Sequence, residues 1–456
     1  MKELQKVCEK IGMHIPEILL PSKNINLMKW SVVACDQYTS QPEYWKEVEK
    51  IVDESPSTLH LIFPEAYLED GDADLRIEKI NSTMEQYLKD NILASIGACL
   101  IYVERETSRK NLRKGLIAAV DLEKYDYYKG AQSLIRTTEE TVLERIPPRV
   151  KIRQNAPIEL PHVMLLIDDP DKTVIEPLAE KTGNLEKLYD FNLMMNGGHI
   201  KGYKISDEET ILGILEALEN LGDKDKFTEK YDIGPDKGVM LFAVGDGNHS
   251  LASAKAHWEK VKAALPYEKL ISHPARYALV EIVNVHDSGL SFEPIHRVVF
   301  NVKAEELLNE AINYFDAASG ASVSSFYIYK TKEHMESELI NYRKRKDVHA
   351  IPFVSGKNYG IISVANPVSS LEVGTLQPFL DEFVKKNNNV KIDYIHGDET
   401  VTSLGSQDGN IGFYLPPMDK HDLFKTVILD GALPRKTFSM GEAEEKRFYL
   451  ECRKIR

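Results

Sequence analysis

The sequence predicts an α+β fold arranged in two or three packed units. Three observations lead to this prediction. The chain has 456 residues, which is too many for one core of ordinary size. Its apolar share of 43% and charged share of 28% are those of a globular protein. Segments with helical and with strand periodicity both recur along the chain, and no internal repeat is found.

The N-terminal part begins with an expected strand over residues 30–34 that ends at Cys35-Asp36. Ser40-Gln41-Pro42-Glu43 has the pattern of a capping box with proline in the first turn, which predicts a helix to about Val52. Asp36 would then lie in a strand-to-helix loop. We expect a further helix over 75–87 and further strands over 60–63, 98–105 and 115–122.

The middle and last parts continue this mixture. Helices are expected over 208–221, 250–264, 304–315 and 332–344, with strands over 163–167, 238–244, 276–285, 295–299, 323–329, 350–354, 360–364 and 410–415. We therefore predict a core domain over residues 1–300 and an α+β domain over residues 301–456. Whether the last segment returns to the core is left open.

Composition narrows the class of protein. A net charge of −14 repels polyanions, which disfavours nucleic acid as the main partner. No signal peptide or bilayer-spanning apolar segment is present, so we expect a cytoplasmic protein without a membrane partner. The four separated cysteines and the histidine spacing match no zinc pattern, and a transition metal is not expected. A homo-oligomer remains compatible with the sequence.

The strongest local signal is Gly245-Asp246-Gly247-Asn248-His249-Ser250, which joins a buried strand to a helix. Two glycines and a helix start make a concave set of backbone N–H groups that favours an anion. Asp246 or Asn248 could cap the helix, and His249 could bind or protonate a phosphoryl oxygen. A capping turn beside a core histidine explains the same residues, and both interpretations stay open.

The second signal is a run of arginines over residues 136–153, interleaved with Glu140. Several guanidinium groups in one segment of an acidic protein suit an anionic ligand. The alternative is a solvated helix with internal ion pairs. We favour the ligand because Pro147-Pro148 is expected to break any helix here, and the arginines continue beyond it. The candidate arginines are Arg136, Arg145, Arg149 and Arg153.

Weaker signals are a tight turn at Asp287, the pair His296-Arg297, and the basic pair Arg435-Lys436 near the end. Each is more often structural than catalytic. Together with the glycine loop and the arginines, they extend the candidate ligand site.

These motifs, in this order, resemble the bacterial and archaeal family called domain of unknown function one-thousand-and-fifteen. Residues 33–36, 136–153, 245–249, 287–297 and 433–438 carry the resemblance. It implies a ParB/sulfiredoxin-like mixed core with additional α/β elements, whose glycine loop binds phosphate. Relatives carry Asp-Gly-His-His-Arg in this loop, whereas Ser250 stands here in place of the arginine. The arginines of the 136–153 segment could supply the missing charge.

The resemblance also implies serine or phosphoserine as a candidate substrate. Our leading hypothesis is therefore an enzyme that transfers a phosphoryl group between a small metabolite and water, a nucleotide or pyrophosphate, with Mg²⁺ as a possible companion of the phosphates. His249, with Asp246 or Asp36 as base, would carry the chemistry. The alternative is a ParB-like regulatory switch that binds CTP or ATP without turnover, and a purely structural scaffold is the third hypothesis.

Overall fold

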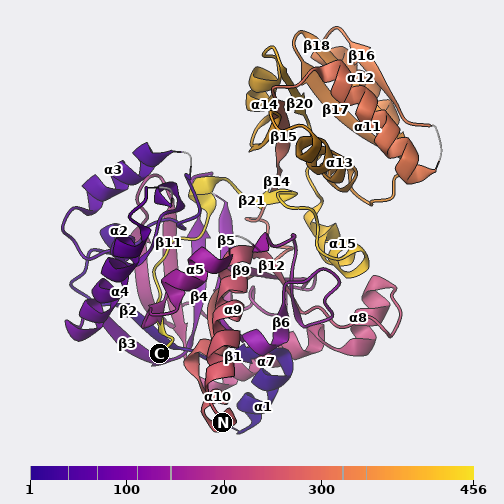
Figure 1. The fold of residues 1–456 in the computed structure, drawn as a ribbon. Helices are drawn as coiled ribbons and strands as arrows, with labels where there is room; N and C mark the ends of the chain where they lie inside the picture. The colour runs from indigo at the N-terminus through magenta and orange to yellow at the C-terminus, as the bar shows by residue number, and fades with distance from the viewer. Residues whose placement is uncertain are drawn as a thin grey trace. The chain divides into compact units, whose positions relative to one another are not determined.

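The computed structural model describes residues 2–39, 41–68, 70–109, 111–143, 146–320, 323–345 and 347–456. The chain forms two compact units (Figure 1). Unit 1 comprises Met1–Ser291 and Met440–Arg456, and unit 2 comprises Phe292–Ser439. A boundary at residue 300 would separate strand β15 from the strands that it pairs with, because β15 spans His296–Phe300 and belongs to the sheet of unit 2.

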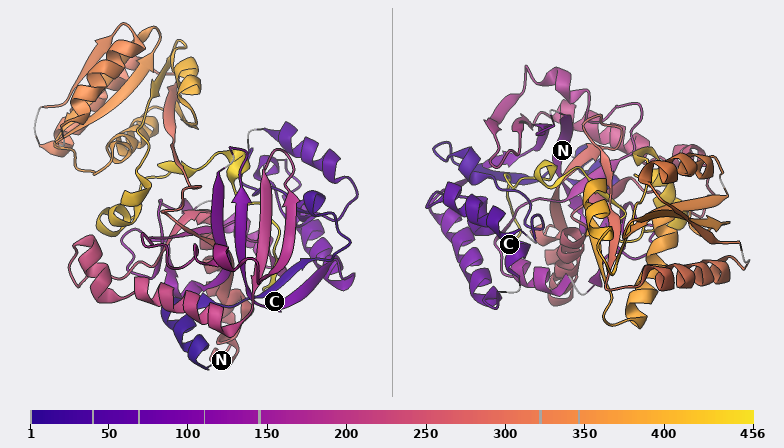
Figure 2. Two further views of the ribbon diagram at one scale, coloured as in Figure 1. Left: turned by 180° about the vertical axis from the view of Figure 1, so that it is seen from behind. Right: turned by 90° about the horizontal axis from the view of Figure 1, so that it is seen from above.

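Unit 1 is built on a ten-stranded mixed sheet in the order β10-β11-β4-β5-β13-β9-β12-β7-β6, with β1 paired to β5. Figure 2 shows the central strands of this sheet side by side. These strands are β1 (Met13–His14), β4 (Leu100–Glu106), β5 (Leu112–Asp121), β6 (Tyr125–Asp126), β7 (Ile135–Thr137), β9 (Met164–Ile167), β10 (Glu186–Asn192), β11 (His199–Ile205), β12 (Phe242–Asp246) and β13 (Tyr277–Asn284).

Both faces of the central strands are buried, as β4 illustrates, since successive residues of a strand point to opposite sides of the sheet. Leu100 and Tyr102 of β4 contribute to one core, and Ile101 and Val103 contribute to the other. The first core also contains residues of the helices α1 (Lys2–Ile11), α7 (Glu208–Leu221) and α9 (Asn248–Ala264). The second core contains residues of α3 (Pro42–Val52), α4 (Ala73–Lys89) and the C-terminal segment, residues 440–456.

The remaining elements of unit 1 are short. They are β2 (Glu17–Pro21) paired with β3 (Leu93–Ala98), β8 (Ile158–Glu159) paired with β22 (Arg453–Lys454), and the helices α2 (Leu27–Trp30), α5 (Ile146–Arg153), α6 (Leu178–Lys181), α8 (Lys224–Tyr231) and α10 (Tyr267–Leu270).

Unit 2 is a six-stranded sheet in the order β16-β18-β17-β20-β15-β19, and every pairing in it is antiparallel. Besides β15, it contains β16 (Ser325–Tyr329), β17 (Val348–Ser355), β18 (Asn358–Ala365), β19 (Lys391–Ile395) and β20 (Asn410–Phe413). Its helices are α11 (Ala304–Ser319), α12 (Lys332–Arg343), α13 (Glu372–Lys386), α14 (Asp398–Gly405) and α15 (Leu423–Asp430). Strand β14 (Phe292–Pro294) pairs with β21 (Phe438–Met440).

The mixed α/β class is confirmed, and most expected helices and strands lie within a few residues of their predicted positions. Two expected strands are wrong. Trp30 is the last residue of α2, and residues 31–34 run beside the C-terminal segment, joined to it by an isolated bridge between Val33 and Phe448. Residues 58–61 form a 3₁₀ turn, because the Ser57 side chain accepts a hydrogen bond from Leu59 N and starts the turn.

The prediction that Pro147-Pro148 breaks any helix is also wrong. Helix α5 begins at Ile146, so both prolines lie in its first turn. Proline is tolerated there because the first backbone N–H groups of a helix have no intrahelical acceptor. Arg149 and Arg153 are therefore one turn apart on the same helix.

Within the residues that the structure describes, no helix has the length and apolar character needed to cross a bilayer.

Candidate functional site

The glycine loop connects β12 directly to α9, as the sequence predicts. Gly247 is the N-cap of α9 with φ of +78°, and among the described residues no side chain caps this end. The Asn248 side chain instead accepts a hydrogen bond from Thr137 Oγ1 at 2.6 Å. An uncapped helix start concentrates backbone N–H donors and the positive end of the helix dipole, so this end of α9 favours an anion.

Gly247 also lets the loop lie directly on the segment before β9. A Cβ atom at this position would stand 2.9 Å from Val163 Cα and 3.4 Å from His162 Cδ2. The first of these contacts is with backbone and cannot be relieved by rotating a side chain. The loop therefore brings the start of α9 next to His162.

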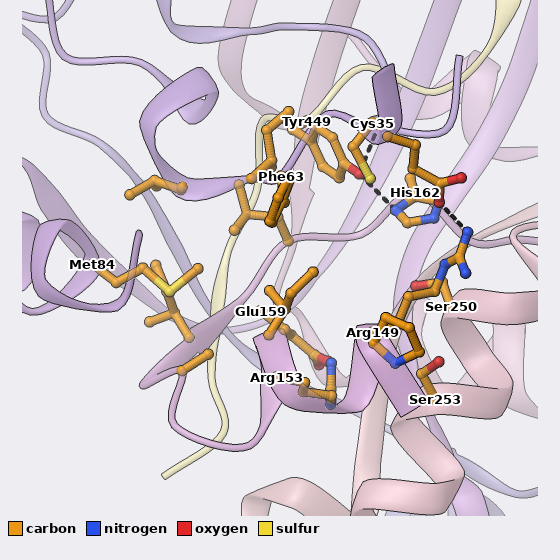
Figure 3. Close-up of a pocket in the computed structure, with 18 of the residues that line it drawn as sticks. Cys35, Phe63, Met84, Arg149, Arg153, Glu159, His162, Ser250, Ser253 and Tyr449 are labelled. Carbon is orange, nitrogen blue, oxygen red and sulfur yellow. Dashed lines mark hydrogen bonds and ion pairs between the residues drawn. The ribbon is translucent and has the colours of Figure 1, made fainter. Parts of the chain in front are cut away.

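A cavity of about 140 Å³ lies beside the first turns of α9 (Figure 3). Ser250 and Ser253, which are three residues apart on one face of the helix, both line it. Its polar lining comes from five separate segments of unit 1. The polar and charged residues are Cys35, Glu65, Arg149, Arg153, Glu159, His162, Ser250, Ser253 and Tyr449.

Two arginines of α5 face this cavity, each in an ion pair. Arg149 pairs with Glu65, and Arg153 pairs with Glu159. Although burial works against a charged carboxyl here, Arg153 and Arg453 hold the pKa of Glu159 below its ordinary value. Arg153 and Arg453 thus share the carboxylate of Glu159, and Arg149 pairs with Glu65.

His162 is held in one orientation by a chain of hydrogen bonds. The Cys35 backbone N–H donates to Tyr449 Oη at 3.2 Å, and Tyr449 Oη lies 2.7 Å from His162 Nδ1. In the tautomer in which Tyr449 Oη donates its proton to Nδ1, the Nε2 atom of His162 carries a proton that it can donate to a ligand oxygen.

The carboxylate of Glu65 lies near His162 in the cavity lining. Burial, followed by the charge of Asp36, raises the pKa of Glu65 above its ordinary value, and Arg149 opposes this shift. The Glu65 backbone N–H donates to Cys35 O at 2.8 Å, which fixes Glu65 beside the loop that carries Asp36. A carboxylate with a raised pKa is suited to accept a proton from a hydroxyl group.

The predicted catalytic residues of the loop make structural contacts of their own. Asp246 forms an ion pair of 3.1 Å with Lys446, which is 6% exposed and comes from the C-terminal segment. The Nε2 atom of His249 accepts a hydrogen bond of 3.2 Å from the Val142 backbone N–H. Gly245 lies against Met440 Sδ, 2.6 Å from the position of a Cβ atom, so a side chain would not fit there.

The other predicted residues of unit 1 lie outside the cavity lining. Arg136 donates to the backbone carbonyls of Ser133, Gly238 and Val239 at 2.9, 2.6 and 3.3 Å, and burial lowers its pKa to about 10. Glu140 pairs with Lys129 at the surface. Asp287 accepts from the backbone N–H groups of Lys114 and Gly289. Arg145 lies outside the described residues.

The remaining predicted residues belong to unit 2. His296 is buried and accepts a hydrogen bond of 3.0 Å from Leu415 N at Nδ1, while its Nε2 atom lies 3.0 Å from Asp398. Arg297 is fully buried and donates to Gln377 Oε1 at 2.6 Å. Arg435 pairs with Asp381 at 2.6 Å. Lys436 follows it with a φ of +58°.

Sequence reasoning missed Glu65, His162, Lys446 and Tyr449. Of these four residues, only His162 stands at a recognisable position in the sequence, since it lies between Pro161 and the strand expected over 163–167. Among the described residues, no group of three His, Cys, Asp or Glu side chains is arranged to hold a metal ion.

We expect the free energy of unfolding of unit 1 to decrease in mild acid, because His257 of α9 binds a proton less readily in the folded chain than in the unfolded chain. Burial, followed by the charge of Arg153, lowers the pKa of His257 to about 4, against an ordinary value of 6.5. Between these pH values the unfolded chain binds a proton that the folded chain does not, so stability decreases as the pH falls. Urea unfolding from about pH 7 to about pH 4.5 should show a smaller decrease for His257→Asn than for the wild type. Parallel pH dependences would contradict this assignment.

Comparison with known proteins places the chain in context. A search of curated proteins finds no match. Three solved structures resemble the chain: a conserved hypothetical protein from Pyrococcus furiosus, a free serine kinase in complex with AMP, and a C-terminally truncated SbnI from Staphylococcus aureus. Their sequence identities are 12%, 12% and 9%, and their TM-scores are 0.35, 0.37 and 0.33.

The matches cover 73%, 74% and 71% of this chain and 90%, 92% and 82% of the respective structures. TM-scores this low do not establish a common fold or activity. The family comparison is different, because one family model matches residues 19–383. This range includes the loop before α3, the arginines of α5, the glycine loop and His162. The chain therefore belongs to the family described as "Protein of unknown function (DUF1015)".

Proposed function

We propose that unit 1 transfers a phosphoryl group to or from a small metabolite, with the phosphoryl group held at the start of α9. One observation carries this proposal: Ser250, Arg149 and His162 line a single cavity beside an uncapped helix start. The backbone N–H groups of the helix start, a guanidinium and an imidazole N–H are donors that suit phosphate oxygens. Catalysis of phosphoryl transfer consists mainly of such positioning and charge stabilisation.

The proposed step needs a base as well as donors. The hydroxyl oxygen of the acceptor attacks phosphorus, and its proton passes to a carboxylate. The bond from phosphorus to the leaving oxygen breaks with its electron pair on that oxygen, which takes a proton from solvent when it leaves as an alkoxide. Glu65 is our first choice for this base because its pKa is raised and it lines the cavity. Asp36, next to Cys35, is the second choice. We assign positioning roles to Asp246 and His249, since Lys446 and the Val142 N–H contact their side chains.

The family resemblance makes serine and phosphoserine the first substrate to test, with water, a nucleotide or pyrophosphate as the other reactant. A Mg²⁺ ion would accompany a nucleotide or pyrophosphate, and Asp36 is the carboxylate that we propose to contact it. We also propose that unit 1 has the ParB/sulfiredoxin-like core that the resemblance implies.

Single-turnover measurement of phosphate transfer from phosphoserine tests this proposal. Arg149→Met should slow transfer about 100-fold, as expected when one donor to a developing charge is removed. Lys151→Met is the matched control, because Lys151 lies on the same helix but is exposed and pairs with the exposed Asp74. Its rate should equal that of the wild type.

Equal and measurable rates for Arg149→Met and the wild type would overturn the proposed site. Equal rates for His249→Ala and the wild type would confine His249 to a structural role. Thermal stabilisation by CTP with no phosphate transfer in any assay would instead identify a nucleotide-binding switch.

A further inference from the structure

The cavity beside α9 has two chemically different ends. Figure 3 shows Ser250 and His162 at one side of the cavity, with Met84 at the other. Hydrocarbon side chains from α5, the strand β8 and residues 61–68 belong to the same hydrophobic cluster as Met84 of α4. We call the Met84 side of the cavity the apolar lobe; it is lined by Leu61, Phe63, Leu68, Met84, Ile152 and Ile158.

The apolar lobe is part of the buried structure. Phe63 is 4% exposed, Met84 is 3% exposed and Ile158 is 1% exposed. At the edge of the lobe, Glu159 accepts hydrogen bonds from Arg153, Arg453 and the Leu279 backbone N–H, while the Nε atom of Arg153 is buried without a hydrogen-bond partner among the described residues. The six residues that define the lobe carry only hydrocarbon or thioether side chains, so a polar group of a ligand would find no strong hydrogen-bond partner among them.

The apolar lobe can add to the affinity of a ligand only when apolar surface of the ligand packs against it. Serine and phosphoserine carry a single methylene group next to their charged groups, so they have nothing to place there. A polar ring would leave its N–H groups or nitrogen lone pairs without partners in this lobe, which costs free energy. An alkyl or aryl group packs against the apolar lobe and leaves no polar group without a hydrogen-bond partner.

We infer that the ligand of this cavity is an amphipathic phosphomonoester, whose phosphate lies at the start of α9 and whose alkyl or aryl group fills the apolar lobe. This inference rests on the proposed function, because it uses the same phosphate position. It changes the class of the substrate from a small amino acid to an ester of a hydrophobic alcohol or phenol.

Calorimetric titration of the full chain with phenyl phosphate, hexyl phosphate, phosphoserine and AMP tests the inference. We expect phenyl or hexyl phosphate to bind at least about tenfold more tightly than phosphoserine, since burial of a group of this size contributes about one or more factors of ten. Equal or tighter binding of phosphoserine would overturn the inference while leaving the proposed function in place. Tighter binding of AMP than of both hydrophobic esters would also overturn it, in favour of a nucleotide.

Substitutions in α4 test whether the apolar lobe causes the preference for hydrophobic esters. Met84→Gln keeps the length of the side chain but makes its end polar, and it should remove the preference for the hydrophobic esters. Met84→Leu keeps the wall apolar and should preserve that preference. Leu75→Gln is the matched control, because Leu75 is 71% exposed on the same helix. A preference that survives in Met84→Gln would overturn the assignment to this lobe, and no binding by any of the four compounds would overturn the proposed function together with the inference.

Discussion

Replacing Arg447 by methionine is expected to destabilise unit 1 by about 3–5 kcal/mol, the usual cost of breaking a buried ion pair. Arg447 is 2% exposed, and it pairs with Glu281 of β13 at 2.8 Å and with Glu451 of its own segment. Although burial works against the guanidinium, Glu451 and Glu281 raise the pKa of Arg447 above its ordinary value. Removing this charge leaves two buried carboxylates without their main partner.

The measurement is urea unfolding of the full chain, compared with Arg76→Met. Arg76 forms exposed ion pairs with Asp70 and Asp72, at 3.4 and 2.8 Å, so its loss should cost no more than about 1 kcal/mol. Similar losses of unfolding free energy in the two variants would show that the buried ion pair contributes no more to stability than a surface ion pair. Because the C-terminal segment also carries Lys446 and Tyr449, Arg447→Met should weaken ligand binding in parallel with stability.

Gly247→Ala is expected to destabilise unit 1 by about 2–5 kcal/mol and to abolish phosphate binding. The first contribution is the left-handed backbone, since φ is +78°. The second is the contact of the new Cβ atom with Val163 Cα at 2.9 Å. Relief of this contact would move the start of α9 away from His162, and the donors would no longer converge on one ligand.

The matched control is Gly213→Ala. Gly213 lies within α7, and a Cβ atom added there has no neighbour within 4 Å. Alanine in an exposed helix should therefore raise stability by about 0.5–1 kcal/mol. Opposite signs for the two substitutions in the same unfolding assay support the role of Gly247, whereas a gain in both would refute it.

Secondary structure was predictable where its causes are local. The helix over 208–221 is bounded by Asp207, whose side chain caps Thr210 N, and its apolar residues follow the helical period. The hairpin of β10 and β11 was missed because one of its faces is largely exposed and its charged and aromatic residues do not form a continuous apolar run. The strand expected over 30–34 was wrong because Trp30 ends a helix that the Asn26 side chain caps, and the residues after it form only an isolated bridge with the C-terminal segment.

The residues of the candidate site likewise fall into two groups, those that local sequence predicts and those that only the tertiary structure brings together. The glycine loop and the start of α9 are encoded within about ten consecutive residues, so backbone freedom and helix capping are enough to indicate an anion site from sequence. The arginines of α5 were also recognisable as a basic group. Their arrangement one turn apart was not, because it depends on prolines that start a helix instead of breaking it.

The rest of the cavity depends on packing between distant segments. Tyr449 lies 287 positions from His162 and 414 positions from Cys35, and Arg149 lies 84 positions from its partner Glu65. Local conformational preferences extend over a few residues, and they contain no information about such pairs. The residue pattern thus predicts the loop at which we propose that a phosphate binds. Burial of the C-terminal segment in unit 1 decides which histidine, carboxylate and apolar wall lie around it.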